Sequence, residues 1–294
     1  MVRGVLIAQV GECLLGYGMV NDGYTDGHGT ILAQRGAVKR MHRSGRTDAS
    51  SEVGLLLLRT SVRAVRVTTV ASRADCEAAG ALFDRVWGMS AMVPTETIIA
   101  TLHAGGHASL AEVDGVVVGA TWGFLASHEG RLGLHSHVTG VLSAHANAGV
   151  GLALKHHQWQ WASKQGLDFV TWTFDPLVRR NAYFNLVKLG AKVSEYHENF
   201  YGVINDGLNR GERTDRVFVM WSVGDSPAPP RGSFVATAEW AVAIPPDIEA
   251  LRRTDPDVAQ GWRDRQRADL RKVFDGPWRI AGYMADGSYA VVPR

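Results

Sequence analysis

Three sets of residues in this 294-residue chain have types and spacings that could do chemistry. His135 and His137 lie two residues apart, Gly149 and Gly151 follow with the same spacing, and Asp175 ends an apolar run. A neutral imidazole can accept a proton near pH 7, and glycine amides can approach an anion closely. A carboxylate such as Asp175 can act as a base or orient an ammonium group.

The two histidines fall within residues 131–142, whose pattern predicts a strand, so both side chains point to one face. Paired histidines on a strand suit zinc, but no cysteine or carboxylate has ligand-like spacing, and we expect no metal. His137 is the candidate general base, and His135 is the other imidazole that could serve. Packing of both rings in the core is the alternative.

The glycines belong to the stretch SAHANAGVGLALK at 143–155, where a strand pattern gives way to a helical one. The first turn of a helix has unpaired N–H groups and partial positive charge, which together favour an anion. The alternative is that the glycines only allow tight packing, and a dinucleotide loop is disfavoured because its third glycine position is Leu154. The amides predicted to bind a pyrophosphate belong to Asn147, Ala148, Gly149, Val150, Gly151 and Leu152.

The elements around these residues follow from periodicity and from turn signals. Asp114-Gly115 predicts a hairpin between two apolar runs, and Gly166 is typical of a helix end. Strands are expected at 65–70, 108–124 (the hairpin), 131–142, 167–174, 191–201 and 216–223, and helices at 72–87, 94–105, 149–166 and 178–190.

The remaining segments divide the chain. Residues 1–62 are rich in Gly and turn formers without an apolar face, which predicts a poorly ordered extension. The alternative is a small appended element that packs through the stretch GLLLLRTSV. The Pro-rich stretch GDSPAPPRGS indicates a linker, so that a domain at 63–224 is followed by an extension at 225–294. We expect a helix from Asp257 to about Asp275 in that extension, and strands before and after it.

Composition excludes several classes of protein. The net charge of +2 and the lack of clustered basic and aromatic residues argue against nucleic-acid binding. Two cysteines fit a reducing compartment. No apolar run approaches the roughly 18 residues that cross a membrane, and no signal peptide is evident, so we expect a cytoplasmic protein.

The order of the predicted elements, with a glycine loop after the fourth strand from residue 65, resembles the GNAT superfamily of N-acetyltransferases. Its loop motif Gln/Arg-x-x-Gly-x-Gly/Ala corresponds here to residues 146–151, with Ala146 in place of the leading polar residue. The stretches at 172–191 and 199–216 resemble one bacterial branch of the superfamily, as does the C-terminal segment. The resemblance implies an α/β (α+β) fold with a mixed, mostly antiparallel sheet, splayed central strands, flanking helices and a C-terminal α/β extension.

The resemblance also implies an acyl-CoA-dependent enzyme that uses acetyl-CoA or another acyl-CoA, including succinyl-CoA, and no metal. Pantetheine would pair with the backbone near Val141 and Leu142, and Asn181 would help to fix the cofactor. The tyrosine that protonates the thiolate in many relatives would fall at Leu186, so Tyr183, three residues earlier, is the candidate acid. Packing of Tyr183 in the core is the alternative, as is helix capping for Asp175.

The polar loop before the strand at 216–223 is where such enzymes recognise the acceptor. Asn209, Thr214 and Arg216 are the candidate substrate-binding residues, and Arg216 would suit the carboxylate of an amino acid, unless it joins a surface ion network. The predicted activity is acyl transfer to the amine of a small metabolite. The alternatives are a non-catalytic acyl-CoA-binding or sensing domain, or a structural protein that forms a homodimer through the helix containing Trp262.

Overall fold

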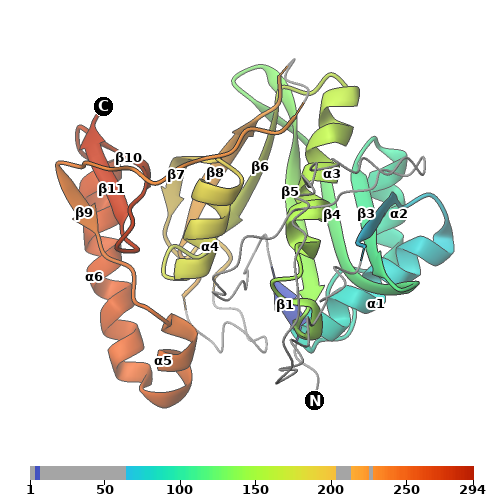
Figure 1. Ribbon diagram of the computed structural model, residues 1–294, viewed down its shortest axis with the longest axis horizontal. Coiled ribbons are helices and arrows are strands. Elements are labelled where there is room, and N and C mark those ends of the chain that lie inside the picture. Colours follow the sequence, from blue (N-terminus) through green and yellow to red (C-terminus); the bar gives the residue numbers. More distant parts are fainter. Residues whose placement is uncertain (1–3, 7–63, 203–212, 225–227) are drawn as a thin grey trace, which may run out of the picture.

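The computed structural model (Figure 1) describes residues 4–6, 64–202, 213–224 and 228–294. The predicted extension at 1–62 therefore lies outside the described residues except for a short strand, and so does Asn209. The described residues form a large sheet with helices on both faces, and a smaller sheet packed with two further helices at the C-terminal end.

The large sheet has the strand order β2–β3–β4–β5–β6–β8–β7, with β1 pairing separately to β5. The strand pairs are antiparallel except for β5 with β6, which is parallel. This arrangement confirms the predicted mixed, mostly antiparallel sheet. The strands are β1 (Gly4–Leu6), β2 (Arg66–Thr69), β3 (His107–Val113), β4 (Val116–His128), β5 (Arg131–Leu142), β6 (Phe169–Phe174), β7 (Lys192–His197) and β8 (Arg216–Ser222).

Two helices cover one face of this sheet and a third covers the other (Figure 1). Helices α1 (Arg73–Trp87) and α2 (Thr95–His103) share a buried cluster with sheet residues such as Leu110. Helix α3 (Val150–Lys164) belongs to a separate cluster with Leu134 and its neighbours. A short 3₁₀ turn (Ser143–His145) precedes α3, and α4 (Arg179–Tyr183) continues into a π-helical turn (Phe184–Lys188).

Local sequence signals account for several of these boundaries. Ser72 and Asp75 form a reciprocal capping box at the start of α1, and Gly88 ends the helix with a φ of 67°. Asp114 and Gly115 both have positive φ values, 52° and 76°, as a two-residue turn between twisted strands requires. The predicted helix start and hairpin are therefore confirmed.

Strands β5 and β6 pair over only three residue pairs, from Gly133–Phe169 to His135–Thr171. Beyond His135 the two strands diverge, and β8 continues the ladder with β6 as far as Phe174. The splayed central strands that the sequence predicts are thus present. At the far end of the open edge of β5, β1 pairs with residues 140–142.

The C-terminal extension carries a second, three-stranded sheet with the order β10–β11–β9. Its elements are β9 (Trp240–Val242), α5 (Ile248–Thr254), α6 (Pro256–Phe274), β10 (Trp278–Tyr283) and β11 (Tyr289–Pro293). The predicted long helix is α6, which Asp255 caps by accepting a hydrogen bond from the Val258 N–H. Trp262 packs within its own chain against a cluster that includes Ile248, and dimerisation through this helix stays a prediction.

The extension shares one hydrophobic core with the preceding domain. A single buried cluster contains Trp172 and Val217 from the large sheet together with Val273 and Tyr289 from the extension. Burial of apolar side chains is the main favourable contribution to folding, so each part stabilises the other. The Pro-rich stretch is therefore a connection between two parts that pack together.

Candidate active site

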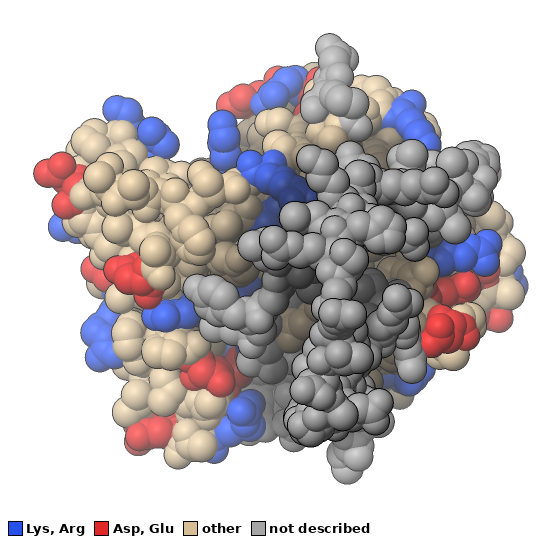
Figure 2. All heavy atoms as spheres, in the orientation of Figure 1, with Lys and Arg blue, Asp and Glu red and all other residues tan. Residues whose placement is uncertain are grey.

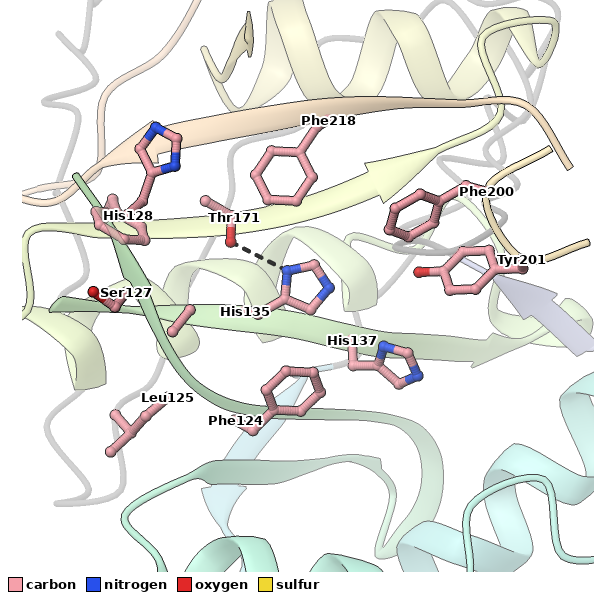
Figure 3. A pocket seen from close by; sticks show the side chains of 12 residues that line it. Phe124, Leu125, Ser127, His128, His135, His137, Thr171, Phe200, Tyr201 and Phe218 are labelled. Carbon is pink, nitrogen blue, oxygen red and sulfur yellow. Dashed lines mark hydrogen bonds between the residues drawn. The ribbon is translucent and has the colours of Figure 1, made fainter. Parts of the chain in front are cut away.

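A pocket of about 380 Å³ opens on the sheet beside the point where β5 and β6 separate (Figure 3). Strands β4, β5, β6 and β8 supply its walls, and the segment after β7 supplies two aromatic residues. Most of its surface is apolar, which is usual for a small-molecule site. The lining residues are Phe124, Leu125, Ala126, Ser127, His128, His135, His137, Phe169, Thr171, Phe200, Tyr201 and Phe218.

His137 lies in a β-bulge of β5. Trp122 of β4 pairs with Val138, whereas the next residue, Gly123, pairs with Ser136, so His137 is an extra residue without a partner in β4. Bulges bend a strand and redirect side chains, and they occur often beside active sites. The bulge explains why His137 and Val138 both face the α1–α2 side of the sheet.

The imidazoles of His135 and His137 point into the pocket, with the Phe124 ring on one side and the Phe218 ring on the other (Figure 3). His135 stacks on Phe218 with ring centroids 5.7 Å apart, and its Nδ1 lies 3.2 Å from the Thr171 hydroxyl. The Nδ1 atom of His137 is buried without a hydrogen-bond partner among the described residues. His137 therefore offers a ring nitrogen that a ligand could engage.

Both imidazoles are neutral at pH 7. Burial, with smaller contributions from His137 and Lys155, lowers the pKa of His135 to about 4. Burial likewise lowers the pKa of His137 from its ordinary value. A neutral imidazole can accept a proton, which is what the predicted base requires.

The glycine loop lies just beyond the far end of β5. Gly149, at the N-cap of α3, has a left-handed φ of 79°, and a Cβ built on it would meet nothing within 4 Å. No backbone partner within the described part of the chain accepts from the N–H groups of Gly149, Val150, Gly151 or Leu152. Asn147, also left-handed with a φ of 63°, and Ala148 are exposed. The helix start thus carries amides without a backbone partner among the described residues, as an anion site needs, although Val150 and Gly151 are buried.

The predicted pantetheine partners Val141 and Leu142 are engaged within the chain. Their backbones pair with Val5 and Gly4 of β1. The edge of β5 therefore pairs with an extended backbone at Val141 and Leu142, as predicted for pantetheine, but the paired segment is β1. A pantetheine arm could pair at these two residues only after β1 moves away.

Asn181 lies in the first turn of α4, a few residues beyond the end of β6. Its side chain is buried, and the amide Nδ2 has no hydrogen-bond partner among the described residues. An unsatisfied buried donor costs free energy, so a ligand or water that accepts from it would be stabilised there. The contribution of Asn181 to cofactor binding stays a prediction.

Asp175 does not have the environment of a catalytic base. It is 2% exposed, and its carboxylate accepts hydrogen bonds from Arg252 and, through both oxygens, from Arg263. Burial alone would raise the pKa of Asp175, but Arg263 and Arg252 hold it well below its ordinary value. Its Oδ1 also accepts from the Leu177 N–H, a bond within the turn before α4; the helix itself has Val178 at its N-cap and no side-chain cap, so the capping alternative is wrong. Asp175 anchors the C-terminal extension to the end of β6.

Tyr183 likewise faces the extension rather than the pocket. Its ring lies against Phe234 and Tyr283, with centroids 5.9 and 6.0 Å away. It is absent from the lining of the pocket. These contacts correspond to the packing alternative and speak against Tyr183 as the acid.

Arg216 and Thr214 are interior residues. Arg216 is 1% exposed, donates to the carbonyl oxygen of Asp215 and lies 5.6 Å from the Tyr201 ring centroid. Thr214 donates to the Gly202 carbonyl and accepts from the Tyr201 N–H. These bonds hold the segment that carries Tyr201, so the two residues position the pocket wall rather than bind a carboxylate directly.

The aromatic lining was not predicted from the sequence. Phe124, Phe200, Tyr201 and Phe218 come from strands and connections far apart in the chain. Alternation along β8 places Phe218 on the same face as Arg216 and Met220, which is a signal for a strand but not for a pocket. Only the sheet order, with β8 beside β6, brings these rings around His135.

No family model matches the chain, and no curated protein matches it. Among solved structures, the chain is similar to Naa50 of Arabidopsis thaliana in complex with a bisubstrate CoA analogue, with 20% identity over 54% of this chain and 98% of that one and a TM-score of 0.44. It is also similar to a GNAT family acetyltransferase of Streptococcus pneumoniae, with 15% identity, 54% and 99% coverage and a TM-score of 0.43. A third is a GNAT family acetyltransferase of Elizabethkingia anophelis with acetyl-CoA bound, with 15% identity, 54% and 97% coverage and a TM-score of 0.40. The likeness is one of fold, over about half of this chain.

The residues that the structure describes contain no group of three or more His, Cys, Asp or Glu side chains placed to hold a metal ion. In that same part of the chain, every helix is too short or too polar to cross a membrane.

Proposed function

We propose that this chain is an acyl-CoA-dependent N-acyltransferase. The observation that carries the proposal is the separation of β5 and β6 directly beside His137, between an amide-lined loop and an aromatic pocket. Solved structures of similar fold include one with acetyl-CoA bound and one with a CoA bisubstrate analogue. Acyl-CoA would supply an acyl group activated as a thioester.

The residues present fit such a co-substrate. The unpaired amides of Gly149, Val150, Gly151 and Leu152 would bind the pyrophosphate. The open edge of β5 beyond His135 offers backbone groups to an extended arm, and the buried amide of Asn181 offers a donor. Displacement of β1 would open residues 140–142 as well.

His137 is the proposed general base. Its unpartnered Nδ1 can accept a proton from the attacking amine, directly or through water, because the ring is neutral at pH 7. The bulge at His137 removes this residue from the β4 ladder, so its backbone is also free of that pairing. The pocket walls would exclude water and orient the amine, which is the main contribution of such a site.

The donor is proposed to be acetyl-CoA rather than succinyl-CoA. A succinyl group ends in a carboxylate, and the described lining residues include no lysine or arginine. Burying a carboxylate without a partner is costly. The small acetyl group has no such requirement.

Calorimetric titration of the full chain with acetyl-CoA and with succinyl-CoA tests the proposal. We expect micromolar binding of acetyl-CoA and weaker binding of succinyl-CoA. Release of free CoA in the presence of amines would then establish transfer. Binding without transfer to any amine would favour the alternative of an acyl-CoA sensing domain, and no binding by folded protein would overturn the proposal.

A further inference from the structure

The chemistry of the pocket lining identifies the class of acceptor, an inference that rests on the proposed function. Five aromatic side chains surround the two histidines: Phe124, Phe169, Phe200, Tyr201 and Phe218. A cavity of about 380 Å³ is far larger than an acetyl group requires. Most of the cavity is therefore available to the acceptor amine.

We propose that the acceptor is a primary amine carried on an apolar, ring-bearing body that has no carboxylate. Aromatic ring faces carry partial negative charge, so they attract an ammonium group and repel a carboxylate. An apolar body gains free energy by leaving water for this lining. The neutral His137 can accept the proton that the ammonium group must lose before the amine attacks the thioester.

Two arginines lie beside rings of the lining, and neither supplies a carboxylate site. Arg131 lies over the Phe169 ring at 5.8 Å and pairs with Glu129. Arg216 lies beside the Tyr201 ring, is almost fully buried and is influenced by the charge of Asp175. Neither belongs to the lining of the pocket. A zwitterionic amino acid would therefore bury its carboxylate among rings and neutral imidazoles, without a cation within the described lining.

The sharpest test compares 2-phenylethylamine with L-phenylalanine, because the two molecules differ only in the carboxylate. With acetyl-CoA and the full chain, we expect 2-phenylethylamine to have the higher kcat/KM by roughly 100-fold, the size of effect that an unpaired buried polar group produces. L-phenylalanine amide, which lacks the negative charge, should fall near 2-phenylethylamine. A kcat/KM for L-phenylalanine equal to or above that of 2-phenylethylamine would overturn the proposal.

A second variant makes the test independent of loss of folding. Ala126 lines the pocket two residues beyond Phe124, so it lies on the same face of β4, and Ala126→Arg adds a cation there at a partly exposed position. We expect this change to reduce the preference for 2-phenylethylamine over L-phenylalanine at least tenfold. Leu132→Arg is the matched control, because Leu132 is 59% exposed and lies outside the lining. An unchanged preference in Ala126→Arg would contradict the assignment of the pocket to the acceptor.

Binding without acyl-CoA separates this proposal from the proposed function. The C2 proton signals of His135 and His137 report on the pocket in an NMR titration of the full chain. 2-Phenylethylamine should shift them, and L-phenylalanine at equal concentration should not. This result would support the pocket assignment even if no transfer occurred. A longer apolar acyl-CoA used in preference to acetyl-CoA, with no shift from any apolar amine, would instead assign the space to the acyl chain and overturn the proposal.

Discussion

The guanidinium of Arg263 holds the carboxylate of Asp175 through two parallel hydrogen bonds of 2.8 and 2.7 Å. These residues lie at the end of β6 and in the middle of α6, and Arg252 adds a third bond at 2.7 Å. Planar, two-pronged pairs of this kind are both strong and specific in geometry. The pair fixes the extension against the strand that forms one side of the splay.

Asp175→Asn should therefore destabilise the whole chain. Removing one partner of a buried ion pair leaves charge without compensation and typically costs about 3–5 kcal/mol. Urea unfolding of the variant measures this loss, and Asp264→Asn on the exposed face of α6 is the control. Normal stability with lost acyl transfer would instead restore the catalytic role that the sequence suggested for Asp175.

A charge placed in the glycine loop should change the affinity for acyl-CoA. Ala148 is exposed beside Gly149, so Ala148→Glu brings a negative charge near the proposed pyrophosphate without disturbing the core. We expect the Kd for acetyl-CoA to rise roughly tenfold at low salt and less at high salt. Ala148→Lys, at the same position, should bind as well as the wild type or more tightly. Equal affinities for both variants would exclude the loop from cofactor binding.

His137→Gln should reduce kcat by roughly 100-fold or more, the usual contribution of a general base. The Kd for acetyl-CoA should stay close to that of the wild type, since the ring is not expected to bind the cofactor. His128→Gln, at the rim of the same pocket, is the control. Wild-type turnover in His137→Gln would show that the amine loses its proton by another route.

The pH dependence of kcat follows from the same residue. The base must be neutral, so activity falls as the pH drops through the pKa of His137 in the bound state. Burial lowers that pKa below the ordinary 6.5, and the acidic limb of the kcat profile should therefore lie below pH 6.5. A limb above pH 6.5 that disappears in His137→Gln would contradict the burial argument.

The free energy of unfolding should fall as the pH drops from 6.5 toward 4. Burial lowers the pKa of His135 and of His157 to about 4, whereas the unfolded chain has the ordinary value of 6.5. The unfolded state then binds more protons between these values, so stability is present above pH 6.5 and is lost progressively toward pH 4. His157→Gln should recover roughly 2 kcal/mol of that loss, measured by urea unfolding at pH 7 and pH 4.5. His103→Gln, at an exposed position, should recover none.

The buried Lys155 should make folding stability depend on pH on the alkaline side as well. It is fully buried, with its Nζ donating to Ser136 Oγ and Gln158 Oε1, and burial lowers its pKa well below 10.5. The unfolded chain binds this proton more readily, so stability should rise as the pH increases from the lowered pKa of the folded state toward 10.5. Lys155→Met should flatten that rise in thermal unfolding, whereas the exposed Lys164→Met should leave it unchanged. An unchanged rise in Lys155→Met would assign the trend to other groups.

Local signals in the sequence were sufficient to predict most helices and strands of the fold. The capping box at Ser72 and the turn at Asp114-Gly115 act within a few residues, and both are present as expected. Helix α5 was not predicted, since it is only seven residues long and follows Pro245 and Pro246. Short elements beside prolines depend on tertiary packing, which periodicity does not show.

The candidate site was predicted only where its chemistry is local. His137 and the glycine loop follow from spacing within one segment. The role of Asp175 could not be predicted in this way, because its arginine partners lie 77 and 88 residues further along the chain. The aromatic wall likewise depends on the sheet order, which brings Phe218 of β8 beside His135 of β5 although their strands are not paired.

The shared core has a consequence for how the chain comes apart. Residues on both sides of the Pro-rich connection bury one another, and the ion pairs of Asp175 tie the same two parts together. Parts that stabilise each other to this degree unfold cooperatively. A destabilising substitution in α6 should therefore disrupt the pocket as well, and a fragment that ends at residue 224 would lose the side chains that the extension contributes to the shared core.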